Sequence, residues 1–255
     1  MKQAENNFVY RTHLEKYVGT EPEVVIPEGV AVVDSLAFVD KDDITAVTFP
    51  ATIEDIYNNA FSDCINLKTL LFPHEVKHLV FGYEAFSDCT ALKSVHLPEG
   101  TDSLWNTFIG CTALSDITLP DSIRIIGDFS FCNCISLKKV KLPANLVYIG
   151  RHSFQGCTGL TEIAIPDGIH DIWEHAFQYC ERLQNVQIPD GVIHIGEEAF
   201  AGCKQLTNLY IPDSVTYIGR KAFAGCAKGF VLQSKNPQWQ DYANKEKLKF
   251  ELIKP

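Results

Sequence analysis

The sequence predicts a solenoid of stacked β coils, and three observations support this prediction. Nine of the twelve prolines recur at a nearly constant interval, namely Pro27, Pro50, Pro73, Pro98, Pro120, Pro143, Pro166, Pro189 and Pro212. Eight of the nine cysteines keep the same interval, each three residues after a phenylalanine. An alternation of apolar and polar residues precedes these prolines. A repeat of about 23 residues is typical of a solenoid, in which one coil cannot bury its apolar residues until others stack on it.

The strand of each coil comes before the proline. Ahead of Pro166, for example, Ile163 and Ile165 alternate with Glu162 and Ala164. A period of two puts the apolar residues on one face of a strand and the polar residues on the other. Proline then ends the strand because it has no N–H for the ladder. The stacked strands are therefore predicted to form a parallel sheet with one face turned inward.

The remainder of each coil turns and then returns to the interior. In the last full coil, Asp213 and Ser214 supply a turn after the proline, and Val215 and Phe223 fall at inward positions. The residue before each cysteine is predicted to take the left-handed conformation, since seven of the eight are Gly, Asn or Asp. The eight are Asp63, Asp88, Gly110, Asn133, Gly156, Tyr179, Gly202 and Gly225, with Tyr179 as the exception.

Both ends of the stack need caps. We predict one structural domain made of an N-terminal cap (1–23), repeats (24–232) and a C-terminal cap (233–255). The second cap is expected to contain a helix after Pro237, followed by a strand over 248–253. The apolar residues assigned to the two caps are Phe8, Tyr10, Leu14, Tyr17 and Val18, and then Trp239, Tyr242 and Ala243.

The repeated unit Leu-x-x-Ile-x-Ile-Pro-x-x-Val-x-x-Ile-Gly-x-x-Ala-Phe-x-x-Cys, over roughly residues 20–232, resembles the BspA-like, treponemal type of leucine-rich repeat. The resemblance implies a right-handed leucine-rich-repeat solenoid of about nine 23-residue coils with a concave parallel sheet. Proteins of this family are often bacterial surface proteins that bind host proteins or other cells. The implied function is thus a non-enzymatic binding or adhesion module, with an intracellular interaction scaffold as an alternative.

The composition limits the partners. The 32 acidic and 22 basic residues give a net charge of −10, which argues against nucleic acid or an acidic membrane surface as the partner. No apolar run approaches the length of a membrane span, so membrane insertion is not expected. The first residues have no apolar signal region, and the many cysteines fit a reducing compartment. Localisation therefore stays open between the cell surface, as the resemblance implies, and the cytoplasm. We expect a monomer.

The cysteines are predicted to be buried free thiols that fill the same small slot in successive coils. Cys132 falls outside this regular spacing and is expected to be the most exposed thiol. Cys132 and Cys134 form a Cys-x-Cys pair that lacks the two further ligands of a structural zinc site. No cofactor is expected.

His74, Glu75 and His78 match the H-E-x-x-H signature of zinc peptidases. That chemistry requires a helix, so that both histidines share one face and the glutamate reaches the bound water. Here the motif follows Pro73, and Val76 occupies an inward position of the repeat, which indicates an extended setting. We predict exposed turn residues, and a zinc-dependent hydrolase is the alternative function that this motif leaves open. His152 and His175 share a column in adjacent coils but supply only half of a metal site.

Catalytic fingerprints are otherwise missing, so we expect that the protein is not an enzyme. The solvent-facing positions of the concave strands are the predicted recognition surface, where a protein or a glycan would bind. Lysines gather there although the chain is acidic, so they either attract an acidic partner or keep a broad sheet soluble. The predicted binding residues on this face are Lys68, Lys93, His96, Lys138, Lys139, Lys141 and Tyr210.

A second candidate surface is the irregular stretch between Pro73 and Cys111. One coil gains two residues, placed around 80–83, and the next coil loses one. Insertions in repeat proteins often map to binding faces. Trp105, together with Tyr57 and Trp173 in the same column, is predicted to lie exposed on the convex side as an interface anchor. A drifted repeat is the alternative explanation.

Overall fold

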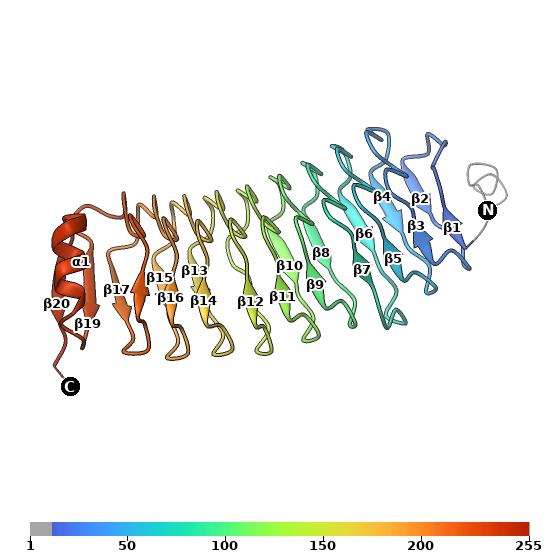
Figure 1. The fold of residues 1–255 in the computed structure, drawn as a ribbon. Helices are drawn as coiled ribbons and strands as arrows, with labels where there is room; N and C mark the ends of the chain where they lie inside the picture. Colours follow the sequence, from blue (N-terminus) through green and yellow to red (C-terminus); the bar gives the residue numbers. More distant parts are fainter. Residues whose placement is uncertain (1–11, 255) are drawn as a thin grey trace.

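All but one of the coils contribute two short strands, one before the proline and one that follows it after a turn. The computed structural model describes residues 12–254, and its coils stack into one elongated body (Figure 1). We call the two strand series the pre-proline ladder and the post-proline ladder. Within each ladder the strands pair in parallel, and most partners occupy equivalent positions of successive coils, such as Glu162 and Asn185. The predicted leucine-rich-repeat solenoid is confirmed.

The pre-proline ladder alternates buried and exposed residues as the period of two predicts. Its strands are β2 (Glu23–Val25), β4 (Ala46–Thr48), β6 (Thr69–Leu71), β8 (Ser94–His96), β10 (Asp116–Thr118), β13 (Glu162–Ala164), β15 (Asn185–Gln187), β17 (Asn208–Ile211) and β19 (Val231–Ser234), with β20 (Lys249–Leu252) pairing on β19.

The post-proline ladder has a strand in each predicted coil of the described chain, so nine coils are confirmed there, preceded by β1 (His13–Leu14). Its other strands are β3 (Val32–Val33), β5 (Asp55–Ile56), β7 (Val80–Phe81), β9 (Ser103–Leu104), β11 (Ile125–Ile126), β12 (Tyr148–Ile149), β14 (Asp171–Ile172), β16 (His194–Ile195) and β18 (Tyr217–Ile218).

The irregular coil differs from the prediction in one respect. Val76 keeps the regular spacing from its proline, but the residue that pairs with Asp55 is Val80, where the regular spacing would place His78. The two extra residues are therefore Lys77 and His78, which lie exposed in the turn, and not residues around 80–83. The extra backbone packs against Gly100, where a Cβ would overlap the carbonyl of Lys77.

The core is a column of phenylalanine rings that runs the length of the stack. Adjacent rings lie 4.5–5.9 Å apart between centroids and are close to parallel. Tyr17 stacks on one end of the column, and Phe230 stacks on the other. The rings of the column are Phe38, Phe61, Phe86, Phe108, Phe131, Phe154, Phe177, Phe200 and Phe223.

The regularly spaced cysteines are free thiols, as predicted, and they also form hydrogen bonds. Each thiol donates to the carbonyl oxygen of a phenylalanine in the preceding coil, at 3.0–3.4 Å. Burial raises the pKa of the Cys64 thiol to about 12, so the S–H donor is retained at neutral pH. Most of these carbonyl oxygens also accept a backbone N–H from three residues later in their own coil, so the thiol supplies a second hydrogen bond that joins two coils.

Cys132 does not follow its prediction. Its side chain is buried, and burial raises its pKa to about 11. The reason is its neighbour in the next coil, because the thiol lies 3.8 Å from the amide oxygen of Gln155. Cys226, in the last full coil, is the partly exposed thiol.

Every coil contains two left-handed residues, and the sequence indicated only one of them. The predicted position before each cysteine has positive φ, including Tyr179 at 59°. A second position lies four residues before the first, with φ between 53° and 62°. It is occupied by residues of many types, namely Leu36, Asn59, Glu84, Asn106, Phe129, His152, His175, Glu198 and Lys221. Each non-glycine residue held there costs about 1–2 kcal/mol.

The ends of the stack use some of the residues assigned to caps. Leu14 and Tyr17 are buried, whereas Val18 is exposed. Phe8 and Tyr10 lie outside the described residues. Beyond the last coil, helix α1 (Trp239–Glu246) buries Trp239 and Ala243 and precedes β20. The hydroxyl of Tyr242, on the same helix, donates to the carbonyl of Gly219. No helix within residues 12–254 is long and apolar enough to cross a membrane.

Removal of one ring from the column should destabilise the fold strongly. Phe131 is fully buried between Phe108 and Phe154, so Phe131→Ala leaves a cavity and is expected to lower the free energy of unfolding by about 3–5 kcal/mol. The control is Phe129→Ala in the same coil, whose ring is partly exposed, and a loss less than half as large is expected. Urea denaturation compares the two, and equal losses would contradict a ring column as the core.

Relief of backbone strain should stabilise the protein. Leu36 is exposed and has φ of 62°, so Leu36→Gly removes the left-handed penalty and is expected to raise the free energy of unfolding by about 0.5–1 kcal/mol. Ile65→Gly, at an exposed position without positive φ, is the control and should lower it by a similar amount. Thermal and urea denaturation test the difference in sign.

Candidate functional site

The solvent face of the pre-proline ladder, which we call the pre-proline face, is hollowed over β13, β15 and β17. A groove of about 580 Å³ lies there, within the range of about 300–1,000 Å³ that is typical of ligand pockets. The outward residues of each strand line it, because successive residues of a strand point to opposite faces. Its polar and aromatic lining consists of Lys139, Lys141, Glu162, Gln184, Asn185, Gln187, Asn208, Tyr210 and Gln233.

Charge inside the groove is nearly balanced. The Lys139 ammonium lies 2.7 Å from a carboxylate oxygen of Glu162, so these two charges neutralise each other. Lys141 is the remaining charged residue of the lining. Asn185, Gln187 and Tyr210 have no side-chain hydrogen-bond partner within residues 12–254. The groove therefore presents neutral donors and acceptors to solvent beside one unpaired cation.

A second hollow, of about 440 Å³, borders the groove where the coils enter the pre-proline strands. Three cations line it, Lys93, Lys138 and Arg182, and all three are exposed. None of them has an ion-pair partner in the part of the chain that the structure describes. Ser115 and Ser136 add hydroxyl groups to the lining. We call this the basic hollow.

The predicted lysines do not form one continuous strip in the structure. Lys139 and Lys141 line the groove with Tyr210, whereas Lys93 and Lys138 line the basic hollow. Lys68 and His96 are exposed on the same face outside both hollows. The amides that line the groove were not among the predicted binding residues, although Asn185 and Asn208 repeat at the same position of adjacent coils. These amides are Gln184, Asn185, Gln187, Asn208 and Gln233.

The predicted strand beneath three of these lysines is not formed. Residues 138–142 have no strand partner, and their one backbone hydrogen bond to a neighbouring coil, within residues 12–254, joins the Thr161 N–H to the Lys138 carbonyl. Lysine has a low strand propensity, and three lysines within four residues gain little from the ladder. The sheet is thus interrupted next to the groove.

The aromatic residues of the irregular stretch pack against one another. The Trp105 ring lies between Tyr83 and Tyr148, with centroids 6.4 and 5.9 Å away. It also covers Gly127, where a Cβ would overlap the indole. Trp105 is only partly exposed because of these contacts, and Trp173 is partly exposed because it packs on Tyr148 and Arg151. The prediction of exposed rings is correct for Tyr57 alone.

The H-E-x-x-H stretch forms an exposed turn, as predicted. The His74 side chain is 92% exposed, and its Nε2 lies 3.3 Å from a Glu75 carboxylate oxygen. His78 belongs to the two-residue insertion, so no helical face aligns the two imidazoles. Within residues 12–254, no three His, Cys, Asp or Glu side chains form a group that could hold a metal ion.

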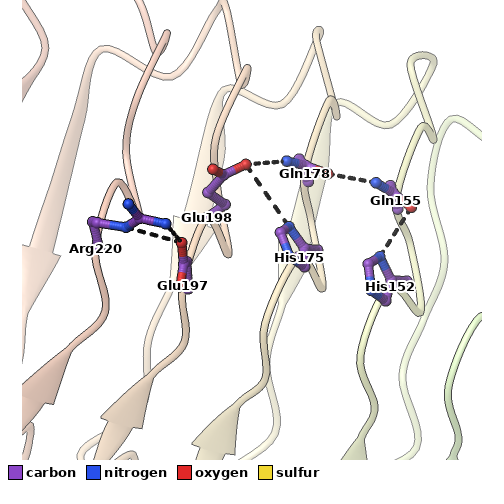
Figure 2. Close-up of polar contacts among 7 residues, drawn as sticks. All are labelled: His152, Gln155, His175, Gln178, Glu197, Glu198 and Arg220. Carbon is purple, nitrogen blue, oxygen red and sulfur yellow. Dashed lines mark hydrogen bonds and ion pairs between the residues drawn. The ribbon is translucent and has the colours of Figure 1, made fainter.

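His152 and His175 stand side by side as predicted, and a chain of side-chain amides accompanies them (Figure 2). The rings stack at 4.6 Å in nearly parallel planes, so their lone pairs do not converge on one ion. Gln155 donates to Gln178, and Gln178 donates to Glu198. At the other end, the Nδ1 of His152 lies 3.0 Å from the Gln155 oxygen.

The Glu198 carboxylate sets the direction of the hydrogen bonds in this chain of amides, and that direction determines the tautomer of His152. Glu198 can only accept, so Gln178 must present its amide nitrogen to it and its oxygen to Gln155. Gln155 then presents its own oxygen to His152, whose Nδ1 must carry the proton. Burial, and then the neighbouring charge of His175, lower the pKa of His152, which favours the neutral imidazole.

Stability should fall in acid through His152. Its pKa is lower in the folded protein than the unfolded value of about 6.5, so the unfolded state binds the proton first and stability decreases as pH falls below that value. His152→Phe keeps a ring against Phe129 and should lessen the loss between pH 7.5 and 5.0. Urea denaturation at both values measures it. His74→Gln, at an exposed site, is the control and should behave as wild type.

Comparison with known proteins agrees with this geometry. No curated protein sequence matches the chain. A crystal structure of a leucine-rich repeat protein from T. pallidum aligns with a TM-score of 0.53 and 21% identity, covering 95% of this chain and 91% of that one. The pneumococcal vaccine antigen PcpA aligns with a TM-score of 0.51 and 18% identity, covering 92% and 80%. At these identities the likeness shows the fold alone.

The repeats themselves give the family. The model of the BspA type leucine rich repeat region matches residues 20–107 and 104–228, in six copies. Leucine-rich repeat proteins are typically binding or adhesion modules and are generally non-enzymatic. The regular prolines, phenylalanines and cysteines of this chain are thus the framework of a BspA-type leucine-rich repeat protein, the family to which it belongs.

Proposed function

We propose that this protein is a non-catalytic binding module whose recognition surface is the pre-proline face, at the groove and the basic hollow. The observation that supports it is the juxtaposition of two hollows whose lining includes Gln187, Tyr210 and Arg182, side chains that have no hydrogen-bond or ion-pair partner within residues 12–254. By contrast, the regularly spaced thiols inside the coils already have hydrogen-bond partners. Groups that the fold does not use are available to a ligand.

The outer aromatic residues are a weaker candidate for the recognition surface. The Trp105 ring packs against neighbouring coils, and Trp173 stacks under the Arg151 guanidinium at 4.8 Å. These contacts join one coil to the next, and they leave less of each ring for a partner. Contacts between coils are therefore enough to explain these aromatic residues without a ligand.

A bulky residue in the groove should abolish binding without unfolding the protein. Ala164 is exposed on the groove wall, so Ala164→Arg fills the space and should change the free energy of unfolding by no more than about 0.5 kcal/mol. Thr48→Arg, at the same strand position of β4 and outside both hollows, is the matched control. Partners captured by wild type and by Thr48→Arg should be missing from Ala164→Arg in affinity-purification mass spectrometry. If Ala164→Arg retains them and Trp105→Ala loses them, the recognition surface lies on the convex side.

A further inference from the structure

The basic hollow concentrates unpaired positive charge on a chain whose net charge is −10. Lys93, Lys138 and Arg182 come from separate coils and line one space. Two of the nearby carboxylates are already engaged, since Glu162 binds Lys139 at 2.7 Å and Glu181 binds Lys204 at 2.6 Å, whereas Asp116, next to Ser115, has no ion-pair partner within residues 12–254. The hollow is thus lined by three cations that have no ion-pair partner within residues 12–254, and they outnumber the one unpaired carboxylate beside it, which favours an anionic ligand.

The groove next to it has different chemistry. Asn185 and Gln187 offer an amide donor and acceptor each, and Tyr210 offers a partly exposed ring with a hydroxyl group. Neutral hydroxyl groups, which both donate and accept, are the natural complement of such a lining. The ring can also pack against the flat apolar face of a sugar.

Adjacent residues of one segment line the two hollows. Lys138 lines the basic hollow, and its neighbour Lys139 lines the groove. This is the segment that does not pair with the adjacent strands. One molecule that runs across the coils can therefore contact both hollows.

We propose that the two hollows together bind an acidic oligosaccharide, with its carboxylate or sulfate groups along Lys93, Lys138 and Arg182 and its neutral sugars along the groove. The inference rests on the proposed function of the pre-proline face. It goes further by naming the class of the ligand and the residues that bind its acidic groups.

The repeat of the coils distinguishes a sugar chain from a peptide. Equivalent positions of the pre-proline strands, such as those of Gln187 and Tyr210, recur once per coil, at the strand spacing of about 4.8 Å. This spacing is close to the length of one pyranose ring in an extended chain. An extended peptide advances about 3.3–3.4 Å per residue, so its residues do not stay in register with successive coils. A ligand that lies along the stack thus matches it best as a polysaccharide.

The test is direct titration of the full chain with defined probes. The probes are a heparin-derived octasaccharide, its desulfated form that keeps the carboxylates, a neutral chitin oligosaccharide and polyglutamate of similar charge. The first variant is Lys138→Ala with Arg182→Ala, and the second is Gln187→Ala with Tyr210→Ala. Lys68→Ala, exposed on the same face and outside both hollows, is the matched control.

Wild type should bind the acidic sugars at least tenfold more tightly than the neutral one, and salt should weaken the binding. The cation variant should lose at least tenfold for the acidic sugars and bind all sugars alike. The groove variant should weaken acidic and neutral sugars equally without a change in salt dependence. The two acidic probes show whether sulfate or carboxylate supplies the charge, and Lys68→Ala should match wild type.

Other results would overturn the inference. Binding to none of the sugars would do so, as would polyglutamate binding as tightly as the acidic sugars. If polyglutamate binds and Ala164→Arg abolishes that binding, the pre-proline face recognises an acidic protein, and the proposed function stands without the glycan. If Ala164→Arg leaves every captured partner in place, the proposed function itself fails.

Discussion

The whole fold depends on one geometric requirement. Each coil must advance by the same distance along the stack, so that equivalent residues of successive coils lie over one another. The phenylalanine column enforces it, because the rings stack closely, with the centroids of Phe131 and Phe154 5.3 Å apart. The thiols reinforce it, since the Cys157 thiol donates to the carbonyl of Phe131 in the preceding coil. A coil that gains residues must expel them, and the Lys77–His78 insertion accordingly lies in an exposed turn while the next core phenylalanine stays in register. Insertions into a coil are thereby confined to the surface.

The same requirement explains the strained backbone. To return to its starting point within one repeat, each coil bends twice through the left-handed region, and the cost recurs along the stack. Residues such as Phe129 and His152 tolerate this because packing between coils outweighs the penalty, and these two rings stack at 4.4 Å. The amide chain from His152 to Glu198 occurs in the same region, where side chains of successive coils face each other (Figure 2). Because the coils repeat, a contact between two adjacent coils recurs along the stack and forms a column of equivalent contacts.

Columns also organise the candidate site. On the pre-proline face, outward residues lie over residues of the next coil, so three consecutive coils with amides create a groove with one chemistry. The lysines acquire different roles according to their neighbours. Lys139 is neutralised by Glu162, while Lys138, one residue earlier, meets Arg182 and Lys93 in the basic hollow. On such a scaffold, the side chains that can bind a ligand are those in columns that have no hydrogen-bond or ion-pair partner within the fold.

The sequence by itself determined the architecture, because the spacing of proline, phenylalanine and cysteine is a local pattern that directly encodes strand, turn and core position. Tertiary structure decided what depends on the neighbouring coil. Leu36 and Phe129 do not look like left-handed residues, since the conformation is imposed by stacking and not by their own preference. Cys132 is covered by Gln155 of the next coil, and Trp105 packs on Gly127 of the next coil. The amides and Arg182 were visible as residues, but only the stacked coils show that they line shared hollows, because a hollow is a relation between coils and no single repeat contains it.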